Sequence, residues 1–80
     1  MSKNKPSLVK KIDLHGVRHH RVKSVVIRGI EDVWNTDTKV EIITGHSSQM
    51  KEIVKEVLDE YELGYEDGDF LNAGYIRTIV

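Results

Sequence analysis

Apolar residues recur at helical spacing in two stretches of the chain, and each stretch follows a short run of alternating apolar and polar residues. Both stripes have the spacing i, i+3, i+4, i+7, i+8 and i+11, which places all members on one face of a helix. The first stripe predicts a helix from Val17 to about Trp34 and consists of Val22, Val25, Val26, Gly29, Ile30 and Val33. The second predicts a helix from Ser48 to Tyr61 and consists of Met50, Ile53, Val54, Val57, Leu58 and Tyr61.

Single residues mark the expected helix ends and one close contact. Ser47 or Ser48 is suited to the N-cap of the second helix, because a serine oxygen accepts a hydrogen bond from the first turn. Gly64 is placed to end that helix as a C′ glycine. Gly29, inside the first stripe, indicates close packing on a sheet, at a propensity cost of about 1 kcal/mol against Ala.

The runs outside the two helices predict four strands. Leu8 to His15 alternates apolar and polar residues at its end, and Val40 to Thr44 precedes the second helix. Tyr65 to Leu71 is a weaker strand, and a hairpin turn at Asn72-Ala73-Gly74 joins it to Tyr75–Val80. The order is therefore β-α-β-α-β-β. A helical crossover makes the first two strands parallel, and the hairpin makes the last two antiparallel. The predicted fold class is an α/β two-layer sandwich, a mixed four-stranded sheet with two helices on one face.

Eighty residues fit one small domain, expected at 10–80 after a flexible basic tail at 1–9. The chain has no cysteine, which excludes disulfides and cysteine-based zinc sites. No run approaches the roughly 20 apolar residues of a membrane span, and the basic N-terminus lacks the apolar core of a signal peptide. We therefore expect a cytoplasmic protein with no membrane partner, and a monomer is favoured.

Charge is divided unevenly along the chain although the net charge is only −1. Residues 1–28 hold eight Lys and Arg and one acid, a net of +7, whereas residues 29–80 hold four Lys and Arg and twelve acids, a net of −8. Such asymmetry suggests a surface that binds a polyanion. The alternative is that both groups of charges are solvated and pair with each other, and the sequence leaves the two interpretations equal.

Two turns follow the predicted parallel strands, Asp13-Leu14-His15-Gly16 and Thr44-Gly45-His46-Ser47-Ser48. Ligands gather beyond the carboxyl ends of parallel strands, and each turn precedes a helix whose free N–H groups can hold an anion. His15 could transfer a proton near neutral pH, and Asp13 could orient it or hold a metal. The predicted phosphate-binding residues are Gly16, Arg18, His19, His20, Arg21, Thr44, Gly45, His46, Ser47 and Ser48.

Each of these residues also has a structural interpretation. Asp13 could accept a hydrogen bond from its own turn, and His46 and Ser47 could serve only as helix-capping residues. Asp13, His15 and His46 could form a metal site, but their spacing is not diagnostic of one. Arg18, His19, His20 and Arg21 are four potential cations that oppose the dipole of the first helix. An anion nearby would make them easier to understand, but solvent screening could equally make their cost negligible.

Three motifs resemble the small MutS-related (Smr) domain family. Ile12-Asp13-Leu14-His15-Gly16 resembles its "LDLHG" signature, and Ile42-Ile43-Thr44-Gly45 resembles its second motif. Residues 72–80 resemble its closing glycine turn and strand, so the likeness covers about residues 10–80. The resemblance implies a sandwich like the C-terminal domain of translation initiation factor 3. It also implies nucleic-acid binding, and endonuclease activity in several members, with the catalytic acid and histidine matching Asp13 and His15.

The chain departs from the family pattern at two positions. Ser47 stands where the Thr-Gly-x-Gly loop has its second glycine, or the loop is shortened so that His46-Ser47 match a later His-Ser pair. Arg21-Val22 replace a Glu-Ala pair, which makes this edge more basic and favours binding over cleavage. We expect a domain that binds DNA or RNA with weak nicking endonuclease (hydrolase) activity; the alternative is a non-catalytic module that binds nucleic acid or protein. A requirement for Mg²⁺ or Mn²⁺ stays open.

Overall fold

The computed structural model of the protein describes residues 9–68 and 74–80, so residues 1–8 of the tail predicted at 1–9 and the turn residues 72 and 73 lie outside it. The first described residue, Val9, already belongs to a strand. The elements are β1 (Val9–Asp13), α1 (His19–Asp32), β2 (Lys39–Ile43), α2 (Ser48–Glu60), β3 (Tyr65–Asp67) and β4 (Tyr75–Ile79). This order is the predicted one. Of the expected strand Tyr65–Leu71, the structure has the first three residues paired, and residues 69–71 lie outside the described ranges.

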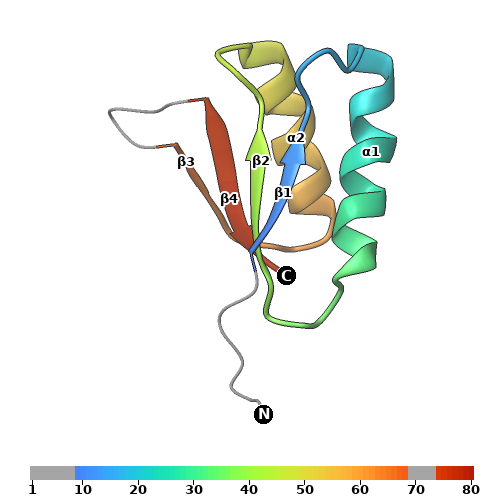
Figure 1. Ribbon diagram of the computed structural model, residues 1–80, viewed down its shortest axis with the longest axis vertical. Coiled ribbons are helices and arrows are strands. Elements are labelled where there is room, and N and C mark those ends of the chain that lie inside the picture. Colours follow the sequence, from blue (N-terminus) through green and yellow to red (C-terminus); the bar gives the residue numbers. More distant parts are fainter. Residues whose placement is uncertain (1–8, 69–73) are drawn as a thin grey trace.

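The four strands form one mixed sheet in the order β1-β2-β4-β3, with both helices on one face (Figure 1). β1 and β2 are parallel, and β4 is antiparallel to both β2 and β3. The predicted fold class is therefore confirmed. The sequence pattern did not reveal that β4 lies between β2 and β3. Because the hairpin adds to β2 and not to β1, β1 forms an outer edge of the sheet beside α1 (Figure 1).

The core fills the space between the sheet and the two helices. Every fully buried helix residue belongs to one of the predicted stripes, because only that face of each helix meets the sheet. Val25, Val33, Ile53 and Tyr61 lie at the margins and are partly buried. The largest fully buried side chains are Leu14, Ile30, Ile42, Leu58, Ile76, Val22, Val26, Val40, Val54 and Val57.

Gly29 brings α1 directly against β1, as its place in the stripe predicted. A Cβ atom added at Gly29 would collide with the Cδ1 atom of Ile12 and would lie 3.1 Å from its Cγ1 atom. The missing side chain therefore sets the distance between the helix and the edge strand. At the far end of α1, the Tyr61 hydroxyl donates to Glu31, and this hydrogen bond raises the pKa of Tyr61 above its ordinary value.

The ends of the helices differ from the expectation at two positions. α1 begins at His19, not Val17, and Arg18 precedes it without a side-chain cap. α2 begins as predicted, with the Ser47 hydroxyl accepting a hydrogen bond from the Met50 N–H. The prediction that Gly64 is the C′ residue is wrong. The C′ residue is Glu62, which takes the left-handed conformation with φ 58°. Its N–H donates to the Asp59 carbonyl and the Leu63 N–H to the Leu58 carbonyl, so the helix ends before Gly64.

Candidate functional site

The two predicted turns leave the sheet side by side. β1 and β2 are in parallel register up to Asp13 and Ile43, and the Leu14 N–H donates to the Ile43 carbonyl over 3.0 Å. Beyond this hydrogen bond, the segments that follow β1 and β2 each turn at a glycine in the left-handed region, Gly16 with φ 80° and Gly45 with φ 66°. Space is open around both glycines, so backbone conformation, not crowding, explains them. α1 and α2 both begin at this end (Figure 1).

The Asp13 carboxylate shapes the first turn. Its Oδ1 atom accepts a hydrogen bond from the His15 backbone N–H over 2.9 Å, and both side chains are exposed. Within residues 9–68 and 74–80, no hydrogen bond joins this carboxylate to the imidazole ring of His15. Asp13 therefore fixes the backbone of the turn through its hydrogen bond to the His15 N–H, and the imidazole ring of His15 is exposed on that turn.

The second turn is tied to the start of β4. Thr44 is buried, and its hydroxyl donates to the carbonyls of Gly45 and Gly74 at 2.8 and 3.3 Å. The backbone N–H groups of Thr44 and Gly45 both donate to the Gly74 carbonyl, at 2.9 and 3.0 Å. These groups therefore join the second turn to the start of β4, and their hydrogen bonds to Gly74 leave them unavailable as donors to a phosphate. In this turn His46 and Ser48 are exposed, whereas the Ser47 hydroxyl caps α2.

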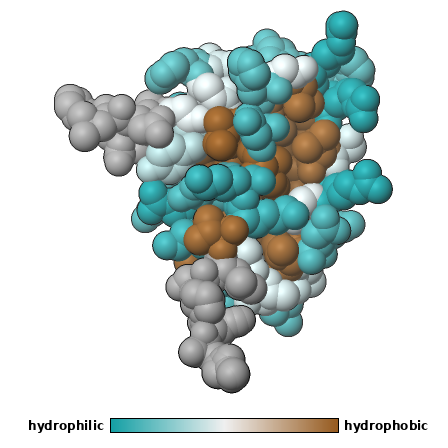
Figure 2. Space-filling view, viewed as in Figure 1, coloured by the Kyte–Doolittle hydropathy of each residue, from teal (hydrophilic) through white to brown (hydrophobic). Residues whose placement is uncertain are grey.

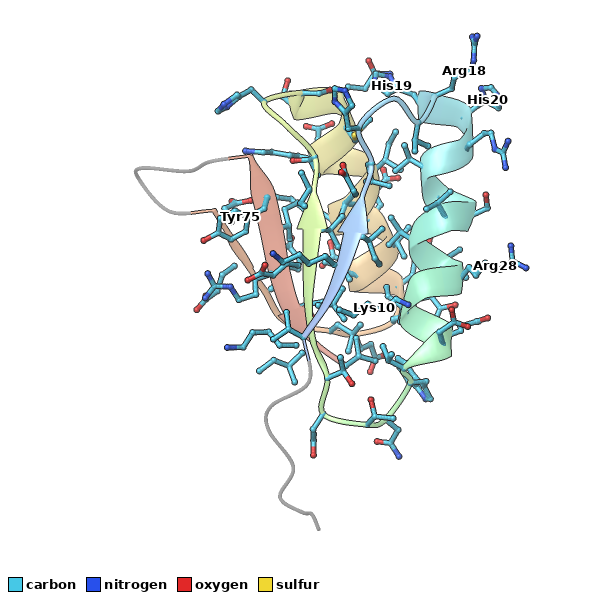
Figure 3. The ribbon with its side chains drawn as sticks, viewed as in Figure 1. Lys10, Arg18, His19, His20, Arg28 and Tyr75 are labelled. Atoms are coloured by element: carbon cyan, nitrogen blue, oxygen red, sulfur yellow. The ribbon has the colours of Figure 1, made fainter. Side chains whose placement is uncertain are left out.

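The start of α1 carries an exposed group of basic side chains, Arg18, His19, His20 and Arg21. Figure 3 shows the first three of them together at the N-terminal end of the helix. The first turn contains no acidic residue that would neutralise them. The guanidinium charges of Arg18 and Arg21 add to the partial positive charge of the helix end, which favours anions here.

A groove that the sequence did not reveal runs from this end along the edge of the sheet. We call it the α1–β1 groove; its main part has a volume of 590 Å³, and an adjoining hollow of 360 Å³ continues it. Arg21 and Val25 line both parts. The other residues of the main part are Lys10, Lys11, Ile12, Asp13, Ser24, Arg28, Gly29 and Asp32. Arg21 and Arg28 are seven residues apart, and this spacing in the sequence would have placed them on the same face of a helix. That β1 lies beside this face follows only from the strand order in the structure.

The alternative metal site is not formed. In the part of the chain that the structure describes, no three histidine or acidic side chains gather closely enough to hold a metal ion, so Asp13, His15 and His46 do not form such a group. None of the helices in the same ranges is long and apolar enough to cross a membrane.

Comparisons with protein-family models, curated proteins and solved structures give no significant match to this chain.

Proposed function

We propose that this protein is a nucleic-acid-binding domain of the Smr type, acting on DNA or RNA. The observation that carries the proposal is the exposed basic group at the start of α1, which has no acid in its helical turn and lies beside two glycine turns. Phosphates are the anions that such an arrangement suits, because arginine offers several N–H donors and the helix end adds free backbone N–H groups. The three motifs that resemble the Smr family support the same assignment.

Weak endonuclease activity would come from Asp13 and His15. An exposed imidazole at the rim of a phosphate-binding surface can accept a proton from the attacking oxygen or donate one to the leaving oxygen. In this proposal Asp13 acts mainly through the turn, since its Oδ1 atom holds the His15 N–H. Its negative charge would also stabilise the protonated ring.

Binding without cleavage is the second candidate, and two observations favour it. Asp13 already has a structural task in the turn, which explains a carboxylate there without catalysis. The Gly45 N–H donates to the Gly74 carbonyl, so it is not free to stabilise the negative charge on a phosphate in the transition state of cleavage.

Isosteric substitution separates the two candidates. Asp13→Asn keeps an oxygen that can accept the His15 N–H but removes the charge, whereas His15→Ala removes only the ring. We would incubate the protein and both variants with supercoiled plasmid and with structured RNA, with and without Mg²⁺ or Mn²⁺. If the protein is a nuclease, wild type nicks or cleaves a substrate, His15→Ala abolishes the cleavage, and Asp13→Asn reduces it about tenfold or more.

Asp59→Asn is the control, because it removes one carboxylate from an exposed position on α2. It should cleave like wild type. Substrate left intact by wild type and variants alike, with binding retained, would establish the non-catalytic candidate. If wild type neither binds nor cleaves DNA or RNA at low salt, the proposed function is wrong.

A further inference from the structure

Basic side chains along β1 and α1 differ from those elsewhere in how they are paired. Arg21 and Arg28, whose side chains line the α1–β1 groove, have no carboxylate within 4.0 Å among residues 9–68 and 74–80. Elsewhere Lys23 pairs with Glu60, Lys55 with Asp67 and Arg77 with Glu66, whereas Lys39 has no carboxylate within 4.0 Å among the same residues. In the groove, Lys10 pairs with Asp32 at 3.8 Å, the one ion pair there among the described residues. Among the described residues, most cations without a carboxylate partner therefore lie on α1 or directly before it, and the others are Lys11 and Lys39 on the sheet.

The two walls of the groove both carry positive charge. Lys10 comes from the edge strand β1, and Figure 3 shows it directed towards α1, whereas the backbone of Lys11 borders the groove and its side chain projects from the opposite face of the sheet. Arg21 and Arg28 come from α1, and Figure 3 shows the Arg28 side chain extending outward from the helix, away from β1. They lie seven residues apart and hence on one side of α1, about 10 Å from each other along its axis. The cations thus follow a line parallel to the helix instead of forming one spot.

The floor of the groove is apolar and narrow. Ile12, Val25 and Gly29 form it, and the close contact between Gly29 and Ile12 closes it from below. Figure 2 shows this face, where hydrophobic residues lie exposed between hydrophilic ones. Cations above an apolar floor suit a flexible chain with regularly spaced negative charges and apolar surface between them. A single nucleic-acid strand has this chemistry, because its unpaired bases are free to meet apolar side chains.

We infer that the α1–β1 groove binds one single strand of nucleic acid along its phosphodiester backbone, as far as Arg28. The inference rests on the proposed function and adds to it the binding path and the form of the substrate. Arg21 joins the groove to the basic group at the start of α1, so the strand runs from Arg28 towards His15 and the two turns. With Lys10 on one side and Arg21 and Arg28 along the other, the groove offers cations to one strand, whereas a duplex would touch only its rims.

Arg28→Ala tests the path, and Lys23→Ala is its matched control. Both residues are exposed on α1, and each variant loses one positive charge, but Lys23 faces Glu60 on α2 and lies outside the groove. Binding of a fluorescein-labelled oligouridylate of about ten nucleotides is measured by anisotropy over a range of salt concentrations. Arg28→Ala should weaken binding roughly fivefold to tenfold at about 50 mM salt and reduce the salt slope by about 0.7. Lys23→Ala should bind like wild type, and melting curves confirm that both variants are folded.

Further arms keep the inference apart from the proposed function. Arg18→Ala, at the start of α1, reports binding at the turns. If Arg18→Ala weakens binding but Arg28→Ala behaves like Lys23→Ala, the groove inference fails and the proposed function stands. If wild type binds no nucleic acid, both fail. A duplex of the same length that binds more tightly than the single strand, or a polyglutamate that displaces the strand at equal charge concentration, would also overturn the inference.

Discussion

Glu62 occupies a backbone conformation that favours glycine. It ends α2 in the left-handed conformation, with φ 58°, and its N–H bonds to the Asp59 carbonyl while the Leu63 N–H bonds to that of Leu58. A side chain in this conformation costs about 1 kcal/mol or more, and glycine carries no such cost. Its carboxylate also lies at the negative end of the helix dipole.

Replacing Glu62 by glycine should therefore stabilise the protein. We expect Glu62→Gly to raise the free energy of unfolding by about 1 kcal/mol, measured by urea denaturation followed by circular dichroism. Glu62→Ala is the control, because it removes the carboxylate but keeps the Cβ atom. If the alanine variant gains as much stability as the glycine variant, charge and not backbone conformation is the cause.

Individual residues of the candidate site were predictable to different degrees. The positions of Gly16 and Gly45 followed from the alternating strands that precede them, and both glycines do take positive φ. The hydrogen bonds of Asp13 and Thr44 did not follow, because a short polar side chain satisfies whichever N–H or carbonyl the turn places beside it. Glu62 escaped prediction for a similar reason, since tertiary packing overrides a preference of about 1 kcal/mol.

Among the secondary-structure elements, the contact between α1 and β1 governs the width of the groove. Gly29 lies so close to Ile12 that a Cβ atom would collide with the Cδ1 atom of the isoleucine. Alanine at position 29 would improve helix propensity by about 1 kcal/mol, but overpacking a buried contact costs typically 1–3 kcal/mol. The packing cost should win, because Ile12 is itself nearly fully buried, with 7% of its surface exposed.

Gly29→Ala should thus lower the free energy of unfolding by about 1 kcal/mol, and Ile12→Val should relieve the effect in the double variant. Removing the Cδ1 atom of Ile12 makes room for the new methyl group, so the two substitutions should be less harmful together than their sum. Chemical denaturation of the four proteins gives the coupling energy. Strict additivity would show that the two residues do not press on each other.

The elements themselves were largely readable from hydrophobic spacing, whereas their arrangement was only partly so. Both helical stripes became buried faces, since a helix must bury its apolar side to be stable. Parallel pairing of β1 and β2 followed from the helix between them. The place of β4 between β2 and β3 did not follow, because a hairpin can join a sheet through either of its strands. The pairing of the hairpin with β2, and not with β1, leaves β1 free to form a wall of the groove.

At the scale of the whole molecule, the separation of charge along the sequence becomes a separation in space. The basic first part supplies β1 and most of α1, whereas the acidic remainder includes α2 and β3. Lys23, Lys55 and Arg77 form ion pairs with acids of α2 and β3. In the groove, Arg21 and Arg28 have no carboxylate within 4.0 Å among the described residues. The net charge of −1 would repel a polyanion weakly, so attraction must depend on where the charges lie.

Two substitutions with the same change in net charge test this dependence on position. Asp32→Asn removes the acid that pairs with Lys10 inside the groove, whereas Glu56→Gln removes an exposed acid on α2. Asp32→Asn should tighten binding of the oligouridylate about twofold to fivefold, since it releases one cation and removes one repulsive charge. Glu56→Gln should leave the affinity unchanged, because salt screens charges beyond about 10 Å. Equal gains in both variants, measured by anisotropy at matched salt, would show that net charge alone controls the interaction. A gain confined to Asp32→Asn would place the polyanion beside Lys10, where the edge strand meets the end of α1.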